Sequence, residues 1–309
     1  MIYTITLNPA IDKTVYVENL KVNQLNRVKE SCQSVGGKGI NVSKALKVLN
    51  SDSIAMGIVA GATGDFLISE LNKAGITCRF QKVAGITRTN LKIINDDRQL
   101  TEVNEAGPWV SKQEIQQFQT ELLSKVVKDD VVVLSGSVTT NVSKDVYYQL
   151  TLLLKEVGCK VIMDADGELF ASGVSALPTL IKPNAYEICQ YFKVEETNDV
   201  KILAGLADKL LALGIEYVVI SLGSQGALFF SKEGSYQVLA LDVEVNSTVG
   251  AGDAMVAGLT KALAEKLDYV EMIKLAVATS ASAVITKGTD CADLKVIADL
   301  KQRVKLIKL

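Results

Sequence analysis

The chain has 309 residues, of which 48% are hydrophobic, enough for a substantial core in one large α/β domain or two smaller ones. Its 33 Lys and Arg residues against 35 Asp and Glu residues leave a net charge of −2, so no bulk charge attracts nucleic acid or an anionic membrane. The chain contains no histidine, which excludes Ser-His-Asp and Cys-His triads and histidine-based zinc sites. Any general base must therefore be a carboxylate, lysine, tyrosine or cysteine.

The N-terminus and the cysteines both predict a cytoplasmic location. Met1 leads directly into a strand-like run, with no charged region before an apolar core, so we expect no signal peptide. No apolar run reaches the length needed to span a bilayer. The five cysteines are scattered and form no C-x-x-C pair, which is typical of thiols in a reducing compartment.

The first strand is predicted over residues 2–7 and stops at the turn signal Asn8-Pro9. Asp12 follows it, where open α/β sheets bind their ligands, although a solvated loop acid would give the same pattern. Residues 14–33 alternate in short polar steps without a helical period. We therefore expect small strands there that leave the main sheet.

A glycine-rich turn at residues 36–39 (Gly-Gly-Lys-Gly) leads into a predicted helix with apolar residues on one face. The turn carries Lys38, and Asn41 lies in the first helical turn. The spacing matches neither the P-loop nor the Gly-x-Gly-x-x-Gly fingerprint. As a lone glycine cluster it is weak evidence for a function.

A buried strand is expected over residues 54–60, followed by a turn at 61–64 and a helix over 65–73. Residues 89–95 and 99–105 resemble a hairpin around Asp96-Asp97-Arg98. Arg88 lies at its entrance, where an isolated arginine is usually a solvated charge.

The second half alternates strands and helices regularly. The segments expected there are strand 131–134, helix 146–156, strand 160–163 ending at Asp164, strand 180–181, the turn Lys182-Pro-Asn184 with Glu187 in the next helix, helix 199–213, strand 217–221 and the turn Gly223-Ser-Gln-Gly226. Such alternation predicts a mainly parallel sheet covered on both faces. Without repeats or linkers, a single domain over 1–309 is expected, with small β excursions at about 12–34 and 88–106.

Residues 246–258 form a second glycine-rich turn that feeds a buried helix. Gly250, Ala251 and Gly252 precede Asp253 and an apolar segment, and helix N-termini of this kind bind anions on their free amides. A carboxylate in the first helical turn is often only a favourable partner for the helix dipole. Alternatively, Asp253 is a general base that takes a proton from a hydroxyl attacking a phosphoryl group.

Together these segments resemble the ribokinase-like (phosphofructokinase B type) sugar kinases over essentially the whole chain. The similarity is carried by residues 6–12, 36–42, 182–184, 221–223 and 247–253. The Asn-Pro-Ala-x-Asp opening, the Gly-Gly-Lys-Gly turn and Thr87-Arg-Thr-Asn90 are most similar to the phosphosugar branch, which holds 1-phosphofructokinases and tagatose-6-phosphate kinases. The resemblance implies a three-layer α/β sandwich with a mainly parallel central sheet, helices on both faces and a small β-sheet lid.

The resemblance also implies roles for individual residues. Asp253 is the expected base, and the amides of Gly250, Ala251 and Gly252 form the expected anion hole for the transferred phosphoryl group. Sugar binding is assigned to Asp12, Gly36, Gly37 and Asn41, with Lys38 and Arg88 on the phosphate that the substrate already carries. Nucleotide binding is assigned to Lys182, Asn184, Glu187, Ser221, Gly223, Gly226 and Ser247. Glu187 is also the expected Mg²⁺ ligand, through water.

The expected reaction is phosphorylation of a ketohexose monophosphate by ATP with Mg²⁺. Fructose 1-phosphate giving fructose 1,6-bisphosphate ranks first, and tagatose 6-phosphate giving tagatose 1,6-bisphosphate second. A catalytically silent regulator that binds nucleotide or sugar phosphate is the remote alternative. A nicotinamide-dependent dehydrogenase is disfavoured because no Gly-x-Gly-x-x-Gly follows the first strand. Exposed lid edges could pair two copies in a homodimer.

The chain departs from the branch in two places. Val138–Asn141 replaces the usual Leu-Pro-x-Gly after Ser137, a residue to which we assign no role. Asp166 stands where the branch often has serine. We expect the first change to alter the shape of a substrate loop, and the second to point away from the phosphates or to help with a cation.

Overall fold

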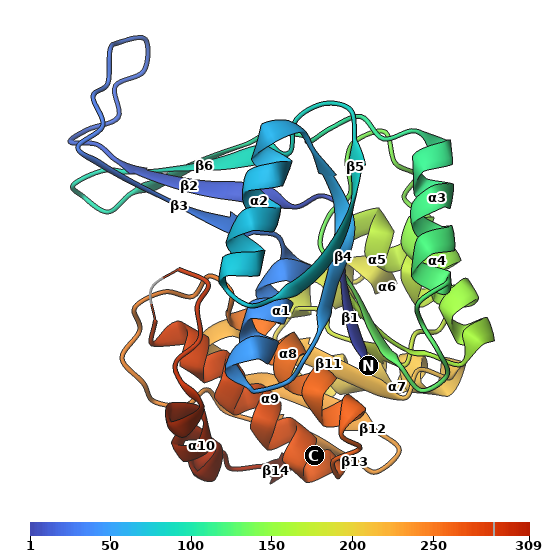
Figure 1. Ribbon diagram of the computed structural model, residues 1–309. Helices are drawn as coiled ribbons and strands as arrows, with labels where there is room; N and C mark the ends of the chain where they lie inside the picture. The colour runs from blue at the N-terminus through green and yellow to red at the C-terminus, as the bar shows by residue number, and fades with distance from the viewer. Residues whose placement is uncertain (287) are drawn as a thin grey trace.

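The structure is a computed structural model that describes residues 1–286 and 288–309. A ten-stranded sheet in the order β14-β13-β12-β11-β10-β9-β8-β1-β4-β5 forms its centre (Figure 1). The strands are β1 (Ile2–Thr6), β4 (Ile54–Ala60), β5 (Thr77–Val83), β8 (Val131–Ser135), β9 (Lys160–Asp164), β10 (Leu180–Ile181), β11 (Tyr217–Ser221), β12 (Ala227–Ser231), β13 (Gly234–Val238) and β14 (Ile307–Lys308). Pairing is parallel from β11 to β5, which confirms the predicted mainly parallel sheet. The antiparallel end, β11 to β14, was not predicted.

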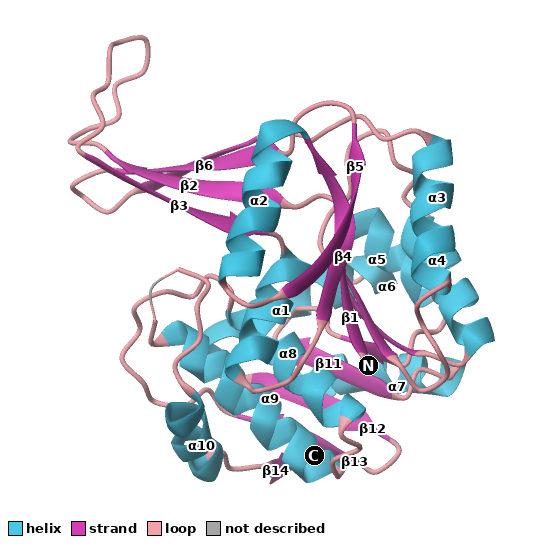
Figure 2. Ribbon diagram, viewed as in Figure 1, coloured by secondary structure: helices cyan, strands magenta, loops and turns pink. Residues whose placement is uncertain are grey.

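Helices cover both faces of this sheet and complete three layers (Figure 2), as predicted. One face carries α3 (Lys112–Leu123), α4 (Val146–Val157), α5 (Gly167–Val174), α6 (Ala185–Phe192) and α7 (Val200–Leu213). The other carries α1 (Lys38–Val48), α2 (Gly61–Lys73), α8 (Ala251–Ala264), α9 (Tyr269–Val284) and α10 (Leu294–Arg303). Successive strand residues point to opposite faces, so Ile2 packs in one core and Ile5 in the other.

A second, four-stranded sheet projects from the body at the upper left of Figure 1. Its order is β3 (Glu30–Gly36), β2 (Ala10–Tyr16), β6 (Arg88–Ile94) and β7 (Leu100–Asn104). Two antiparallel pairs, β2 with β3 and β6 with β7, are joined by parallel pairing of β2 with β6. The expected small strands and hairpin are therefore present, and together they form this separate sheet.

The predicted start of the helix after β4 was wrong. The expected turn at residues 61–64 is the first turn of α2, which begins at Gly61. A Cβ on Gly64 would lie 2.9 Å from the Cβ of Val59, so glycine lets this helix start pack directly on β4. No helix in the described ranges combines the length and apolarity that crossing a membrane requires.

Candidate active site

Several polar residues meet at one edge of the central sheet because parallel strands end on the same side. β1 is followed by Asn8, β8 by Ser137 and β10 by Lys182, while β9 ends at Asp164. The starts of α1 and α8 face the same region, because Asn41 of α1 contacts Asp253 of α8. The predicted convergence of the loops is thus a property of the strand order.

Asp253 is the third residue of α8. Gly250 caps this helix in the left-handed conformation, with φ 84°, which favours glycine. The Asp253 side chain is only 8% exposed, and its Oδ2 accepts a hydrogen bond of 2.7 Å from Nδ2 of Asn41. The carboxylate therefore has a fixed position between two helix N-termini.

The environment of Asp253 suits proton transfer near neutral pH. Burial raises its pKa to about 6, and the charge of Asp164 adds to this effect. The hydrogen bond from Asn41 and the charges of Lys38 and Lys182 act in the opposite direction. A base titrating near the working pH combines the ionised form with good proton affinity.

Asp164 forms ion pairs with two lysines near the Asp253 carboxylate. Its Oδ1 lies 3.3 Å from the Nζ of Lys38 and 3.3 Å from the Nζ of Lys182. Burial alone would raise the pKa of Asp164, but the two ammonium groups outweigh it and lower the pKa. For Lys38, burial favours the neutral amine, yet Asp164 and then Asp253 outweigh it and raise the pKa. No role for Asp164 was expected from the sequence.

Lys182 stands beside the predicted anion hole. The Nζ of Lys182 lies 3.5 Å from the position that a Cβ on Gly252 would occupy. The Ala251 amide donates a long hydrogen bond of 3.5 Å to the Thr248 carbonyl, so it is partly engaged within the turn. Helix geometry leaves the next amides free of intrahelical partners. An anion at the start of α8 would thus meet helix amides and an ammonium group together.

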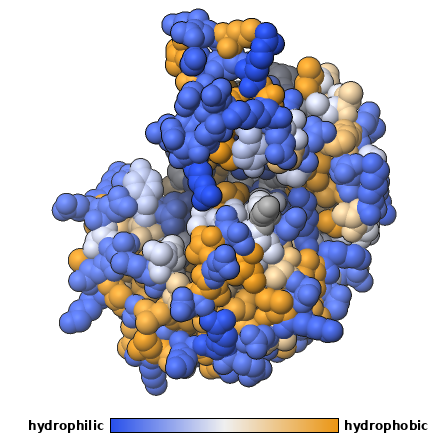
Figure 3. Space-filling model, turned by 90° about the vertical axis from the view of Figure 1, so that its left-hand side faces the viewer, coloured by the Kyte–Doolittle hydropathy of each residue, from blue (hydrophilic) through white to orange (hydrophobic). Residues whose placement is uncertain are grey.

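A cavity of about 260 Å³ opens between the small sheet and the body, and in Figure 3 the sheet and its connecting loop project above a hollowed surface. The body contributes Thr6, Asn8, Gly37, Lys38, Asn41, Gly136, Ser137 and Asp166 to its lining, and the small sheet contributes Asp12, Arg88, Asn90, Lys92, Glu102 and Asn104. The structure therefore brings five of the six predicted sugar-binding residues into one cavity. Gly36, the sixth, borders it, because a Cβ there would lie 2.2 Å from the Oδ2 of Asp12.

Two polar pairs in this cavity include residues that sequence reasoning missed. Asn90 donates a hydrogen bond of 3.0 Å to Oδ1 of Asp12, and Nη2 of Arg88 donates one of 3.3 Å to Oγ of Ser137. The Nε of Arg88 is buried and has no partner among the described residues, so a bound anion would satisfy it. The sequence contained a signal for each of these two residues. Ser137 directly follows a buried strand, where ligand-binding loops lie, and Asn90 lies two residues after Arg88, so both residues share one face of a strand.

The two departures from the family pattern have different outcomes. Asn141 accepts a hydrogen bond of 3.2 Å from the Val110 amide, and Val138 is buried. The replaced loop thus packs against the segment before α3, while Ser137 stays in the cavity. Asp166 is exposed and lines the cavity, and its expected orientation away from the phosphates or role with a cation stays a prediction.

The Lys182-Pro-Asn184 turn is held by a capping box at the start of α6. The Asn184 side chain accepts from the Glu187 amide at 2.7 Å, and Glu187 Oε2 accepts from the Asn184 amide at 2.8 Å. This Asn-x-x-Glu spacing is a helix-start signature that the sequence displays. Burial raises the pKa of Glu187 despite that hydrogen bond. The carboxylate therefore has a structural function alongside its predicted one.

No group of three or more Asp, Glu or Cys side chains within the described ranges is arranged to hold a metal ion. However, Oδ2 of Asp164 is buried and has no hydrogen-bond partner in the described part of the chain. Glu187 has one oxygen in the capping box, and its second oxygen is a further carboxylate donor near Asp164. Carboxylate oxygens completed by water and phosphate are the donors that Mg²⁺ takes. The residues present therefore fit a magnesium ion held mainly through water.

Of the remaining predicted nucleotide-binding residues, three lie at or just after the end of β11, at the antiparallel end of the sheet, and Ser247 lies apart from them, beside the end of α9. The Ser221 amide donates a hydrogen bond of 3.0 Å to the Pro183 carbonyl, which joins the end of β11 to the Lys182 turn. Gly223 begins the short helix η1 (Gly223–Gln225), and a Cβ on Gly226 would lie 2.0 Å from the Val238 carbonyl oxygen. Ser247 lies in the loop before α8 and accepts from the Val249 amide at 3.2 Å.

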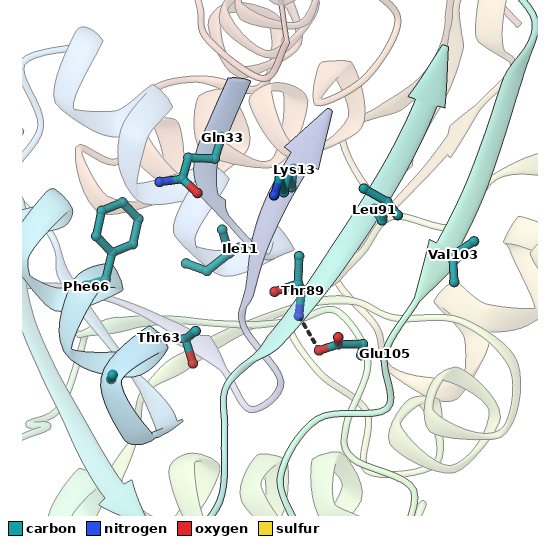
Figure 4. A pocket seen from close by; sticks show the side chains of 10 residues that line it. Ile11, Lys13, Gln33, Thr63, Phe66, Thr89, Leu91, Val103 and Glu105 are labelled. Atoms are coloured by element: carbon teal, nitrogen blue, oxygen red, sulfur yellow. Dashed lines mark hydrogen bonds between the residues drawn. The ribbon is translucent and has the colours of Figure 1, made fainter. Parts of the chain in front are cut away.

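A larger cavity of about 540 Å³ lies on the opposite face of the small sheet, against α2 (Figure 4). Strand alternation explains the division: Ile11 and Thr89 point into this outer cavity, while their neighbours Asp12 and Asn90 point into the inner one. The outer cavity contains none of the predicted site residues.

Comparison with known proteins agrees with this geometry. The sequence profile of the pfkB family carbohydrate kinases matches residues 5–295. A tagatose-6-phosphate kinase of Staphylococcus epidermidis is 34% identical over 280 residues, 89% of each chain. A 1-phosphofructokinase of Bacillus subtilis is 33% identical over 311 residues, 100% of each chain. The crystal structure of phosphofructokinase-2 from Escherichia coli in complex with potassium covers 98% of both chains, with 27% identity and a TM-score of 0.92.

Proposed function

We propose that the chain phosphorylates fructose 1-phosphate to fructose 1,6-bisphosphate. The chain belongs to the pfkB family of carbohydrate kinases. It is therefore a phosphotransferase with an alcohol group as acceptor and ATP as co-substrate. The observation that carries this proposal is the pairing of two features in one cavity. Asn41 lines the cavity and donates a hydrogen bond to the buried carboxylate of Asp253. Arg88 lines the same cavity, and its guanidinium donates a hydrogen bond to Ser137. The buried Nε of Arg88 has no partner among the described residues. A substrate with both a hydroxyl to deprotonate and an anionic group fits this pair.

In the proposed reaction the acceptor hydroxyl of the sugar attacks the γ-phosphoryl group of ATP in line. Asp253 accepts the hydroxyl proton, while ADP leaves with the electrons of the broken phosphoanhydride bond. The amides at the start of α8 and the ammonium group of Lys182 stabilise charge on the transferred group. Asp12 and Asn90 orient the sugar, and the mutual hydrogen bond between them fixes both side chains beforehand.

Bound Mg²⁺ would neutralise charge on the ATP phosphates. The residues that would hold it are Asp164, through the Oδ2 that has no hydrogen-bond partner among the described residues, and Glu187, through water. Both stand beside Lys182, since Asp164 is paired with this lysine and the charge of Lys182 acts on Glu187. The nucleotide is assigned to the adjacent strand ends, at Asn184, Ser221, Gly223, Gly226 and Ser247.

Tagatose 6-phosphate is the second candidate substrate. The Staphylococcus epidermidis relative named for it matches this chain with the same level of identity as the 1-phosphofructokinase. The latter match runs over the whole of both chains, whereas the former covers 89% of each, and this favours fructose 1-phosphate. A silent regulator is disfavoured because a protein that only binds has no use for a buried base.

We further propose that two copies associate through the small sheet. Its outer strands β3 and β7 present exposed edges, with every residue of β7 exposed, and free strand edges pair readily with another chain. The loop between β2 and β3 also exposes Val22 and Leu25, at 80% and 77%. Sedimentation of the Leu25→Asp variant tests this association: the variant is expected to be monomeric, and an unchanged dimer or a monomeric wild type would contradict it.

The test of the proposed activity is ADP release with fructose 1-phosphate, tagatose 6-phosphate and fructose 6-phosphate, compared by kcat/KM. We expect at least a tenfold preference for fructose 1-phosphate, about 1.4 kcal/mol of transition-state binding. A preference for tagatose 6-phosphate would assign the neighbouring activity with the same catalytic residues. Tight ATP binding without turnover of any of the three would reject the proposed reaction.

A further inference from the structure

We propose that Lys92 is a specificity-determining residue, which binds the phosphate already present on the sugar together with Arg88 and Ser137. This inference rests on the proposed function, because it concerns the anionic end of the same substrate. Lys92 lies on β6, within the family match but outside the short motifs to which roles were assigned from the sequence. The assignment depends on which face of the small sheet presents the residue and on which other cations the cavity offers.

The strand register places Lys92 on the face of the small sheet that looks into the inner cavity. Asp12 of β2 is opposite Asn90 of β6, and Asn90 is opposite Asn104 of β7. Two residues further along the same strands, Lys92 is opposite Glu102. Residues two apart on a strand share a face, and all five residues line the inner cavity. Leu91, between them, lines the outer cavity instead.

The cavity lining contains three cations, Lys38, Arg88 and Lys92. The ammonium group of Lys38 is paired with the buried Asp164 at 3.3 Å, so much of its charge is already balanced at the catalytic end. The guanidinium of Arg88 is bonded to neutral Ser137 and experiences the charge of Asp12. In the described part of the chain Lys92 takes part in no ion pair.

The carboxylates of the lining make a further free cation necessary. Asp12, Glu102 and Asp166 also border the cavity, and each repels an anionic ligand. A phosphate monoester carries a charge of about −1.5 to −2 at neutral pH. Arg88 alone cannot offset such a group against three carboxylates. Lys92, half-buried and opposite the exposed Glu102, is the cation in the lining that remains available for it.

This position also explains how the small sheet can respond to the substrate's phosphate. Arg88 and Lys92 belong to β6 of the small sheet, whereas Ser137 follows β8 of the central sheet. A phosphate held by all three joins the two sheets across the cavity. A ketose without a phosphate offers no anionic group to these two cations of β6, and it therefore gains less from contact with this strand.

The test compares Lys92→Met with Lys92→Arg and a matched control, Lys13→Met. Lys13 lies on the adjacent strand β2, one residue from Asp12, but lines the outer cavity. Each variant is assayed for KM towards the preferred ketohexose monophosphate, KM towards ATP and kcat. Turnover of the unphosphorylated ketose is measured in parallel, because a variant that is unstable or misfolded would lose activity towards both sugars.

We expect Lys92→Met to raise KM for the sugar phosphate about tenfold or more, which is the loss of one charge-assisted contact. KM for ATP should stay within about twofold in each variant, Lys92→Arg should recover most of the affinity, and Lys13→Met should match the wild type. Turnover of the unphosphorylated ketose should be unaffected by Lys92→Met. An unchanged KM in Lys92→Met, or an equal rise in Lys13→Met, would overturn the assignment.

A direct binding measurement keeps this test separate from the proposed activity. Calorimetric titration with fructose 1-phosphate and with tagatose 6-phosphate gives Kd for the wild type and for Lys92→Met. If the wild type turns over neither sugar phosphate, the proposed reaction fails. Weaker binding of either sugar phosphate to Lys92→Met would then still support the phosphate subsite, and equal binding would reject it.

Discussion

The side-chain amide of Asn41 donates a 2.7 Å hydrogen bond to the carboxylate of Asp253, and it thereby links the first turn of α1 to the first turn of α8. The two residues are separated by 212 positions in the chain. The bond stabilises the ionised carboxylate in a buried position, where desolvation favours the protonated form. In the proposed reaction, Asn41 therefore both orients the carboxylate that accepts the proton and shifts the pH range in which that carboxylate is ionised.

The first prediction concerns pH. Because the pKa of Asp253 is raised to about 6, the carboxylate accepts a proton only above that pH, and kcat should fall as the pH drops through about 6. Removing the Asn41 amide removes a contact that favours the charged form, so Asn41→Ala should move this acidic limb to higher pH. The profile is measured as kcat at saturating sugar phosphate, since the free sugar phosphate itself titrates near pH 6. A limb that stays in place or moves to lower pH in Asn41→Ala would contradict the assignment.

The second prediction concerns the stability of the charge cluster. Asp164→Asn leaves Lys38 and Lys182 without their shared counter-ion, and Lys182 is 5% exposed. Breaking a buried ion pair by removing one partner is strongly destabilising, so we expect a loss of about 3 kcal/mol in the free energy of unfolding. Asp166→Asn, two residues along and exposed, serves as the control and should change stability by less than about 0.5 kcal/mol. Equal effects in urea denaturation would show that the ion pairs contribute nothing particular.

The third prediction concerns the helix that carries the base. A Cβ on Gly258 would lie 2.7 Å from the Cα of Ala276, so Gly258→Ala forces α8 away from α9. We expect a loss of about 2 kcal/mol from this overpacking. At Gly205, in the middle of α7, no atom of the described residues outside the adjacent backbone of the helix lies within 4 Å of the position that a Cβ would occupy. Gly205→Ala should therefore stabilise by about 0.5–1 kcal/mol. Thermal unfolding of both variants checks the contrast in sign, and a stabilised Gly258→Ala would mean that the helices can separate freely.

The strand-to-loop pattern was sufficient to predict the mainly parallel sheet covered by helices and the helix start that carries Asp253. Residues 54–60 and 131–134 are continuous hydrophobic runs that predict buried strands, and the structure has β4 and β8 at these positions. Gly250–Asp253 could be predicted as a helix start because glycine, small residues and an acid precede a long apolar segment. These signals are local, so a single sequence contains them.

The parts that could not be predicted depend on contacts between distant segments. Nothing in the sequence indicates that β2 pairs in parallel with β6, yet that register brings Asn90 to Asp12. The pairing of Asp164 with both Lys38 and Lys182 likewise joins three separate loops. The antiparallel strands β12 to β14 were missed because a short apolar run such as β12 cannot be distinguished from a helix segment by periodicity. β13 and β14 are short and contain polar residues.

The most direct test of the account is the Asp253→Asn variant, in which the buried carboxylate becomes a neutral amide of nearly the same shape. We predict that kcat with the preferred ketohexose monophosphate falls by a factor on the order of a thousand. Calorimetry should show ATP affinity close to that of the wild type, because the anion-binding amides and Lys182 are retained. A variant that keeps a tenth or more of the normal kcat would show that Asp253 is not the base and would contradict the account.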